Sequence, residues 1–462
     1  MNKTINKRKT RVDLIGGPVF KNLLFFAGPI LLGTIVTQLY HVADSVIVGQ
    51  FVGSEALAAV SAGGPVMSLI QLFMIGLSSG STVAIAQRAG AGNKKALQSA
   101  VGTIAFLTLV CSAFITCAGL LLCRPLLQIL GTPPEIVRDS YLYLVIIYLG
   151  VTGNLCYNMG NGVLQGMGDS TWPFLFLLLC SGLNVGLDLV AVLILGWGVP
   201  GVAAATSFSQ LVSGIGVVWR INSGDYGIEV KLKTIRPDKK AAGDIIAIGL
   251  PAAIQNIGNS IAALCVQSSV NHFGTDFIAA NSVVVKVDDL ICIPVMALST
   301  ALCTFVGQNM GVFRLDRIKK GINSCILSLT VLGVGLCLIL IRLRGVLPLI
   351  FSSNPEVVSI ASKGLFIMSF QCIFFGVDRC LVNAMRGAGK AVVPMITAQF
   401  GAFSRIPLAY LLGVRREDSM GIFYALLIAA FLRMAAIGIY YYGGGWTKAV
   451  RHFEEKHRIE AD

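Results

Sequence analysis

The chain has 462 residues, of which 55% are hydrophobic and only 13% are charged, and its mean hydropathy is +0.77. This balance excludes a soluble globular protein, because a water-exposed surface needs many more charged side chains. The formal net charge of +13 would suggest a nucleic-acid-binding protein in a soluble chain, but here the basic residues gather in loops between apolar segments.

Apolar runs long enough to cross a bilayer follow one another along the whole chain. A hydrocarbon core about 30 Å thick requires about 20 apolar residues in a helix, and only helices or closed barrels satisfy backbone groups in lipid. The sequence therefore predicts an all-α integral membrane protein with twelve transmembrane helices. In chain order they cover 19–46, 57–85, 95–122, 137–164, 171–195, 199–220, 243–267, 281–306, 319–341, 357–384, 392–413 and 419–442.

The loops on the two sides of the predicted membrane differ in charge. Lys and Arg are frequent before the first span, in the central loop 221–242 and in the tail 443–462, whereas the loops on the opposite side contain few. The positive-inside rule then places both termini in the cytoplasm. The basic excess therefore indicates topology and no nucleic-acid partner. We expect a multi-pass protein of the cell membrane, and specifically of a bacterial inner membrane.

An internal repeat relates the two halves of the chain. Similar motifs recur at a constant offset of 221 residues in four separate loops, which indicates duplication. The matches include Gln87-Arg88-Ala89-Gly90 with Gln308-Asn309-Met310-Gly311, Pro134-Glu135 with Pro355-Glu356, Gly166 with Gly387, and Pro173 with Pro394.

The repeat defines the expected domain organisation. A cytoplasmic segment, 1–17, precedes an N-lobe at 18–220; a linker at 221–242 leads to a C-lobe at 243–442 and the tail 443–462. Six spans per lobe give both lobes the same orientation in the membrane. They should form two six-helix bundles related by a pseudo-two-fold axis along the membrane normal, with a cavity between them, as in some transporters. Transport by alternating access fits this architecture better than a channel or an enzyme.

Two acids lie inside the predicted spans of the first half, where an unpaired charge is costly and functional roles are common. Asp44 is in span 1, and Asp188 is in span 5, four residues after Asn184 on the same helix face. The two carboxylates could share a proton or coordinate a small cation. Alternatively, each is a structural acid bonded to neighbouring hydroxyls and amides. Pro29 removes a backbone hydrogen bond inside span 1 and could let that helix bend.

The second half carries a different set of charges within its spans. Lys286 and Asp289 in span 8 are three residues apart and could neutralise each other. Asp378 lies in span 10, and Arg405 in span 11 is the repeat equivalent of Asn184. A substrate or gating role for these charges is one interpretation, and charge balance is the other. One lobe is expected to handle the coupling ion and the other to be its charge-balanced counterpart.

The motifs together resemble the multidrug and toxic compound extrusion (MATE) family, in its DinF-like branch, over almost the whole chain. Motif order and spacing make this resemblance specific. The segments that carry it are Gly28-Pro29, Ala43-Asp44-Ser45, Gln87 to Gly92, Gln308 to Gly311, Asn158 to Asp169, Leu183-Asn184 to Asp188, and Gly201 to Thr206.

The resemblance implies antiport, in which amphipathic and often cationic compounds are exported in exchange for H⁺ or Na⁺. It implies a coupling-ion site made of Asp44, Asn158, Asn184 and Asp188, a bend of span 1 at Pro29, and no cofactor other than the coupling ion; Na⁺ at Asp44 and Asp188 is the one metal considered. Part of the family has a glutamate near the position of Asn259, where this chain has no acid. Coupling is therefore expected through the first half of the chain. We expect a monomer.

Two other functions are alternatives to the expected antiporter. A flippase for lipid-linked oligosaccharides has a similar architecture, but it would need a more cationic cavity than a chain in which acids accompany most internal cations. An intramembrane enzyme would need a convergent catalytic set at membrane depth, and His41 is the one candidate for it. The sequence does not identify the exported substrate, because polyspecific cavities have ordinary apolar walls.

Overall fold

Helices make up every regular element in the part of the chain described by this computed structural model, residues 11–444 and 446. This result confirms the predicted all-α class. Residues 1–10 of the predicted N-terminal segment lie outside the described residues, and so do residues 445 and 447–462 of the predicted tail. The chain forms two compact units. Unit 1 contains the residues up to Asp13 and Phe25–Ala253, and unit 2 contains Leu14–Leu24 and the residues from Ile254 onward.

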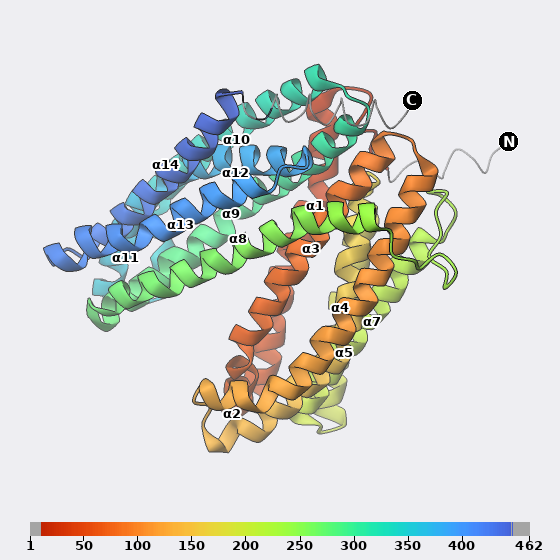
Figure 1. Cartoon of the computed structure of the whole chain (residues 1–462). Helices are drawn as coiled ribbons and strands as arrows, with labels where there is room; N and C mark the ends of the chain where they lie inside the picture. The colour runs from red at the N-terminus through yellow and green to blue at the C-terminus, as the bar shows by residue number, and fades with distance from the viewer. Residues whose placement is uncertain (1–10, 445, 447–462) are drawn as a thin grey trace. The chain divides into compact units, whose positions relative to one another are not determined.

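Unit 1 is a bundle of long helices, several of which run side by side in Figure 1. Two of its helices, α1 and α6, continue into short π-helical segments, Val48–Val52 and Val190–Ile194. Its helices are α1 (Val19–Ile47, whose first residues belong to unit 2), α2 (Ser54–Ala62), α3 (Gly64–Gly90), α4 (Lys94–Ile129), α5 (Pro134–Gly166), α6 (Thr171–Leu189), α7 (Gly198–Ile221) and the first part of α8 (Lys239–Asn271).

Unit 2 is a second helical bundle, in which α9 packs against α10, α11 and α12, and α13 packs against α14. Short 3₁₀ turns lie at Leu347–Ile350 and Val414–Arg416. Its helices are the rest of α8, α9 (Gly274–Gly311), α10 (Leu315–Leu343), α11 (Pro355–Ser369), α12 (Gln371–Gly387), α13 (Val392–Leu412) and α14 (Met420–Tyr442).

Ten helices in the described part of the chain are long and apolar enough to cross a membrane, and an eleventh candidate is the bent pair α11 and α12. The remaining predicted span corresponds to α13, which contains Gln399 and Arg405 and is not among these ten. All twelve predicted spans therefore correspond to helical segments.

Two spans predicted as continuous helices are broken. The span expected at 57–85 is divided into α2 and α3, because Gly63 and Gly64 precede Pro65 at the start of α3, and proline has no N–H for the preceding turn. The span expected at 357–384 bends by 45° between α11 and α12. Pro29, by contrast, lies inside α1, which continues on both sides of it.

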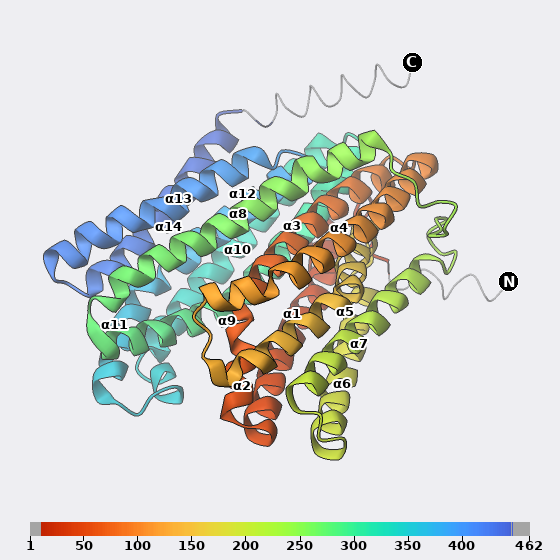
Figure 2. The same cartoon turned by 60° about the horizontal axis from the view of Figure 1, so that its bottom comes forward.

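Glycines allow the helices of unit 1 to approach closely. A Cβ atom at Gly153 of α5 would lie 2.6 Å from the Cα atom of Leu211 in α7, and one at Gly214 of α7 would lie 2.8 Å from the carbonyl oxygen of Gly153. Small residues at such positions let membrane helices pack backbone to backbone. Figure 2 shows α5, α6 and α7 next to one another at this side of unit 1.

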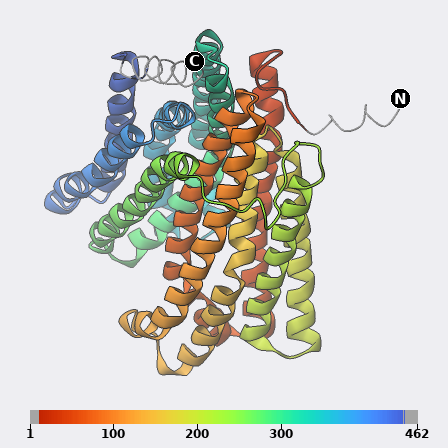
Figure 3. The same ribbon diagram turned by 45° about the vertical axis from the view of Figure 1, so that its right-hand side comes forward.

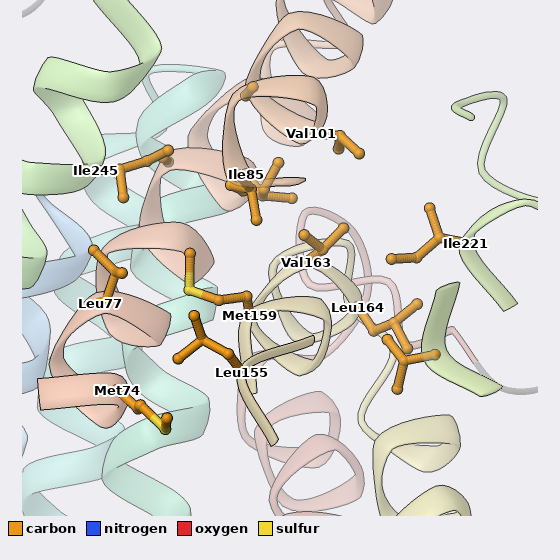
Figure 4. Close-up of a cluster of buried hydrophobic side chains, with 14 of the residues drawn as sticks. Met74, Leu77, Ile85, Val101, Leu155, Met159, Val163, Leu164, Ile221 and Ile245 are labelled. Atoms are coloured by element: carbon orange, nitrogen blue, oxygen red, sulfur yellow. The ribbon is translucent and has the colours of Figure 1, made fainter. Parts of the chain in front are cut away.

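An apolar cluster fills the space between the helices of unit 1. Figure 4 shows Ile85 of α3, Val101 of α4 and Val163 of α5 pointing toward one another, with Met159 and Ile221 beside them. All five side chains are almost fully buried. Dense packing of this kind fixes the positions of the helices that carry the polar side chains of the unit.

Local contacts repeat between the two units at the predicted offset of 221. A Cβ atom at Gly166 would lie 2.7 Å from the carbonyl oxygen of Thr82, and one at Gly387 would lie 2.5 Å from that of Cys303. The turns that follow are also alike, since Gly168 and Gly389 have φ of 86° and 80°. The sequence repeat therefore corresponds to a repeat of local structure.

A polar cluster joins the start of α6 to the end of α7. Asp169, fully buried, accepts a hydrogen bond of 2.7 Å from the Tyr226 hydroxyl and lies 3.7 Å from the guanidinium of Arg220. Arg220 also pairs with Asp225 and lies over the rings of Trp172 and Tyr226, 4.9 Å from each centroid. Burial and the Asp169 carboxylate raise the pKa of Tyr226 well above its ordinary value.

The linker after α7 is bound to unit 1 along its length. Gln98 of α4 exchanges two hydrogen bonds with the backbone of Glu229, and the N–H of Asp238 donates to Thr103 at 3.0 Å. In Figure 3 this yellow-green loop lies at one end of the unit 1 helices. The segment is thus part of the fold of unit 1.

Asp238 caps the first turn of α8, and replacing it should make stability depend on pH. Its carboxylate accepts a hydrogen bond of 2.7 Å from the N–H of Ala241, which lowers the pKa of Asp238. We expect Asp238→Ala to lower the free energy of unfolding by about 1 kcal/mol at pH 7. The stabilisation is present above the ordinary pKa of about 3.9 and is lost as the pH falls through the lower folded value. Thermal unfolding in detergent between pH 7 and 3 should show the two proteins converging.

Asp238→Asn is the matched control, because its amide oxygen can cap the helix and does not titrate. A stability difference between Asp238→Ala and wild type that stays constant down to pH 3 would contradict the capping role.

Candidate functional site

The carboxyl groups of Asp44 and Asp188 meet inside unit 1. Asp44 lies near the end of α1 and Asp188 near the end of α6, and their side chains lie close enough to interact. Asp188 is fully buried, whereas Asp44 is half-buried. An ionised carboxylate has only acceptor atoms, so two ionised carboxylates in this arrangement repel each other, and a proton or a cation between them would remove the repulsion.

Asn184 lies one helical turn before Asp188 and connects it to α7. In the amide orientation that satisfies both partners, its nitrogen donates to Oδ2 of Asp188 at 3.0 Å and its oxygen accepts from the Thr206 hydroxyl at 3.2 Å. Asn184 is 1% exposed and Thr206 7% exposed. The amide thus holds one oxygen of Asp188, while Oδ1 of Asp44 and Oδ1 of Asp188 have no hydrogen-bond partner among the described residues.

Two tyrosines complete the surroundings of the carboxyl pair. Tyr40 lies one turn before Asp44 on α1, and its hydroxyl lies near Thr206; Tyr143 comes from α5. Both rings lie within electrostatic range of Asp44 and Asp188. Tyr143 also packs against the apolar cluster of Val48, Ala56, Val199 and Val202. The pair is therefore surrounded by side chains that limit the access of water.

Each carboxyl is followed by a π-helical segment. The segment Val48–Val52 begins four residues after Asp44, and Val190–Ile194 begins two residues after Asp188. The two segments contact each other. Single π-helical turns inside helices are frequent at functional sites, because they displace the following side chains relative to an α-helix.

Asn158, the fourth residue implied by the resemblance, has other partners. Its amide nitrogen donates to the carbonyl oxygen of Asn154 at 3.0 Å and to that residue's side-chain oxygen at 2.5 Å. The backbone carbonyl oxygen of Asn158 accepts a hydrogen bond of 2.7 Å from the Ser78 hydroxyl. The hydrogen bonds that the described residues show thus connect Asn158 to Asn154 of the same helix and to α3.

The charges of the second half lie on four helices of unit 2. Asp378 of α12 is fully buried, and its Oδ2 lies 2.9 Å from both Arg379 and Arg433. Arg405 of α13 lies within electrostatic range of Asp378. Lys286 and Asp289 are exposed on α9, and the ammonium group of Lys286 lies 5.8 Å from the centroid of the Phe351 ring.

Comparisons with known proteins identify the family of the chain. A family model described as MatE matches residues 29–190 and 251–411. The chain is 29% identical over 406 residues to the probable multidrug resistance protein YoeA of Bacillus subtilis, covering 85% of this chain and 87% of that protein. It is 26% identical over 382 residues to an FAD transporter of Shewanella oneidensis, covering 79% and 81%.

Solved structures share the fold. A MATE crystal structure in the bent conformation matches with a TM-score of 0.88 at 23% identity, covering 98% of this chain and 99% of that one. An outward-facing multidrug resistance MATE family transporter matches with a TM-score of 0.87, also at 23% identity, covering 96% and 98%. Because the family model matches both halves of the chain, this protein belongs to the MATE family, whose members are membrane transporters and not enzymes.

Proposed function

We propose that this protein is a secondary antiporter that exports amphipathic compounds in exchange for H⁺ or Na⁺, and that Asp44 and Asp188 bind the coupling ion. The contact between two acceptor-only carboxyls inside the membrane carries the proposal. Such a pair takes up one proton or one small cation and is neutralised by it. The names of relatives as multidrug resistance proteins support export of amphipathic compounds.

The mechanism follows from the difference in charge between the two states of the pair. With the ion bound, the pair carries less negative charge and tolerates tighter closure around it; without the ion, repulsion favours an arrangement that admits water. An ion that binds one conformation better shifts the population toward it, and only by that difference in affinity. The π-helical segments after Asp44 and Asp188 are the parts of α1 and α6 that would respond first. The distribution of basic residues supports a cell-membrane location with both termini in the cytoplasm.

Everted membrane vesicles test the coupling. With pH and sodium gradients imposed independently, we expect the wild type to accumulate a cationic dye under one of the two gradients. Asp44→Asn should lose this gradient-driven uptake by about two orders of magnitude, because an amide takes up no proton at these pH values and supplies no negative charge to balance a cation. Asp139→Asn, which changes an exposed acid of α5, is the matched control and should transport normally. Unchanged uptake by Asp44→Asn would contradict the proposed coupling site.

A further inference from the structure

Four arginines gather inside unit 2 around two acids. Arg379 lies within electrostatic range of Arg386, Arg405 and Arg433. The acids are Asp378, which Arg379 and Arg433 share, and Asp288, which lies near Arg405. Four positive and two negative charges leave an excess of two. Lys286 and Asp289, exposed on α9, add one charge of each sign and leave the excess unchanged.

The hydrogen bonds of the cluster leave many guanidinium donors unused. Arg386 donates to the side-chain oxygen of Gln255, a neutral partner, and Asp378 holds both Arg379 and Arg433 through the single atom Oδ2. Arg405 makes no ion pair or hydrogen bond among the described residues, and its buried Nε has no partner. A guanidinium has five N–H donors, and an uncompensated buried cation is costly. Among the described residues, the cluster therefore has more guanidinium donors than carboxylate acceptors.

The internal repeat relates two of the arginines to polar residues of unit 1. Asn158 and Asn184 of unit 1 correspond, at the offset of 221, to Arg379 and Arg405 of unit 2. The positions equivalent to Asp44 and Asp188 are Cys265 and Ala409. The local register supports this correspondence, because Gly166 and Gly387 make equivalent contacts. The same place in the repeated bundle thus has two acids and two amides in one unit, and two arginines and no acid in the other.

We propose that Arg379 and Arg405, with Arg386 and Arg433 beside them, bind an anionic group, a carboxylate or a phosphate, of the exported solute. This inference rests on the proposed transport function and adds that its substrates include amphipathic compounds that bear a carboxylate or a phosphate. Arg405 is the main ligand, because its guanidinium is not already paired. Planar guanidinium groups bind carboxylate and phosphate through two parallel hydrogen bonds. Arg379 and Arg433 keep donors for the same anion while they hold Asp378.

Rhodamine 110 and rhodamine 123 form a matched pair of probes, because the second is the methyl ester of the first and lacks its free carboxylate. Fluorescence polarisation with the purified full chain should show that the wild type binds rhodamine 110 more tightly than rhodamine 123. Arg405→Gln should weaken rhodamine 110 binding about tenfold and leave rhodamine 123 binding unchanged. Arg405→Lys should keep part of the preference, since it retains the charge. Arg342→Gln, which changes an exposed arginine of α10, is the control.

The outcomes separate this inference from the proposed function. Equal binding of both probes by wild type, or equal losses for both in Arg405→Gln, would overturn the anion site. If gradient-driven uptake of rhodamine 123 persists in that case, the antiporter function stands without it. Nanodiscs of phosphatidylcholine with and without phosphatidylglycerol distinguish the source of the anion. If phosphatidylglycerol abolishes rhodamine 110 binding by wild type but leaves rhodamine 123 binding unchanged, a lipid headgroup occupies the site and the proposal for a solute is overturned.

Discussion

Replacing Asp188 by Asn should stop ion-coupled export as completely as replacing both Asp188 and Asp44. In the proposed function the two neighbouring carboxyls share one ion, so the loss of either would remove the binding site. Residues that act as one unit give strongly non-additive effects. We expect each single variant and the double variant to lose about two orders of magnitude in gradient-driven dye uptake. Initial rates in everted vesicles, normalised to the amount of protein in the membrane, measure this.

The comparison of single and double variants is the informative part of this experiment. If the carboxyls act separately, the fold losses of Asp44→Asn and Asp188→Asn should multiply in the double variant, and that result would refute a shared ion. Thr206→Val serves as a control of a different kind. It removes the hydroxyl that holds Asn184 but keeps both acids, so it should reduce the rate without abolishing coupling.

Arg220→Ala should be the most destabilising of the substitutions considered for unit 1. Arg220 is 6% exposed and accompanies the fully buried carboxylate of Asp169, which also caps the N–H groups of Thr171 and Trp172. Removing one partner of a buried ion pair typically costs about 3–5 kcal/mol, because the remaining charge stays buried without compensation. We expect a lower thermal midpoint in detergent and less protein in the membrane.

A double variant separates the charge from the packing. Asp169→Asn removes the charge that Arg220 neutralises, so Arg220→Ala should cost less when it is introduced into Asp169→Asn than into wild type. The stacking of Arg220 on Trp172 and Tyr226 is lost in both backgrounds. Equal costs in the two backgrounds would assign the whole effect to packing and would contradict the electrostatic explanation.

The positions of the helices could be predicted from the sequence, and their breaks could be predicted less well. Apolar runs mark spans because lipid excludes charges, and each predicted span corresponds to helical segments. Pro65 could have indicated the break between α2 and α3, since proline begins helices more readily than it continues them. The 45° bend between α11 and α12 has no such residue at Phe370, and it depends on tertiary packing that no local pattern reports.

Some residues of the candidate site could also be predicted from the sequence, and others could not. Asp44 and Asp188 could be identified because ionisable groups inside a span are unusual, and Asn184 because it lies one turn from Asp188. The family resemblance placed the two carboxyls in one expected site, but helix periodicity alone could not bring them together, because their contact depends on how α1 and α6 are rotated. Tyr40 had a weak signal, four residues before Asp44. Tyr143 had none, since a tyrosine in an apolar span is unremarkable until its neighbours are known.

The bound linker of unit 1 affects how the chain can be cut or extended. Because the backbone of Glu229 and Asp238 is hydrogen-bonded to α4, most of the conformational entropy of this segment is already lost when unit 1 folds. The linker therefore does not act as a flexible spacer between α7 and α8. Deleting residues from it would remove these hydrogen bonds and destabilise unit 1. Leu232, which is 90% exposed, lies at the outer turn of the segment, and a protease site or an epitope inserted there would disturb the fewest of these bonds.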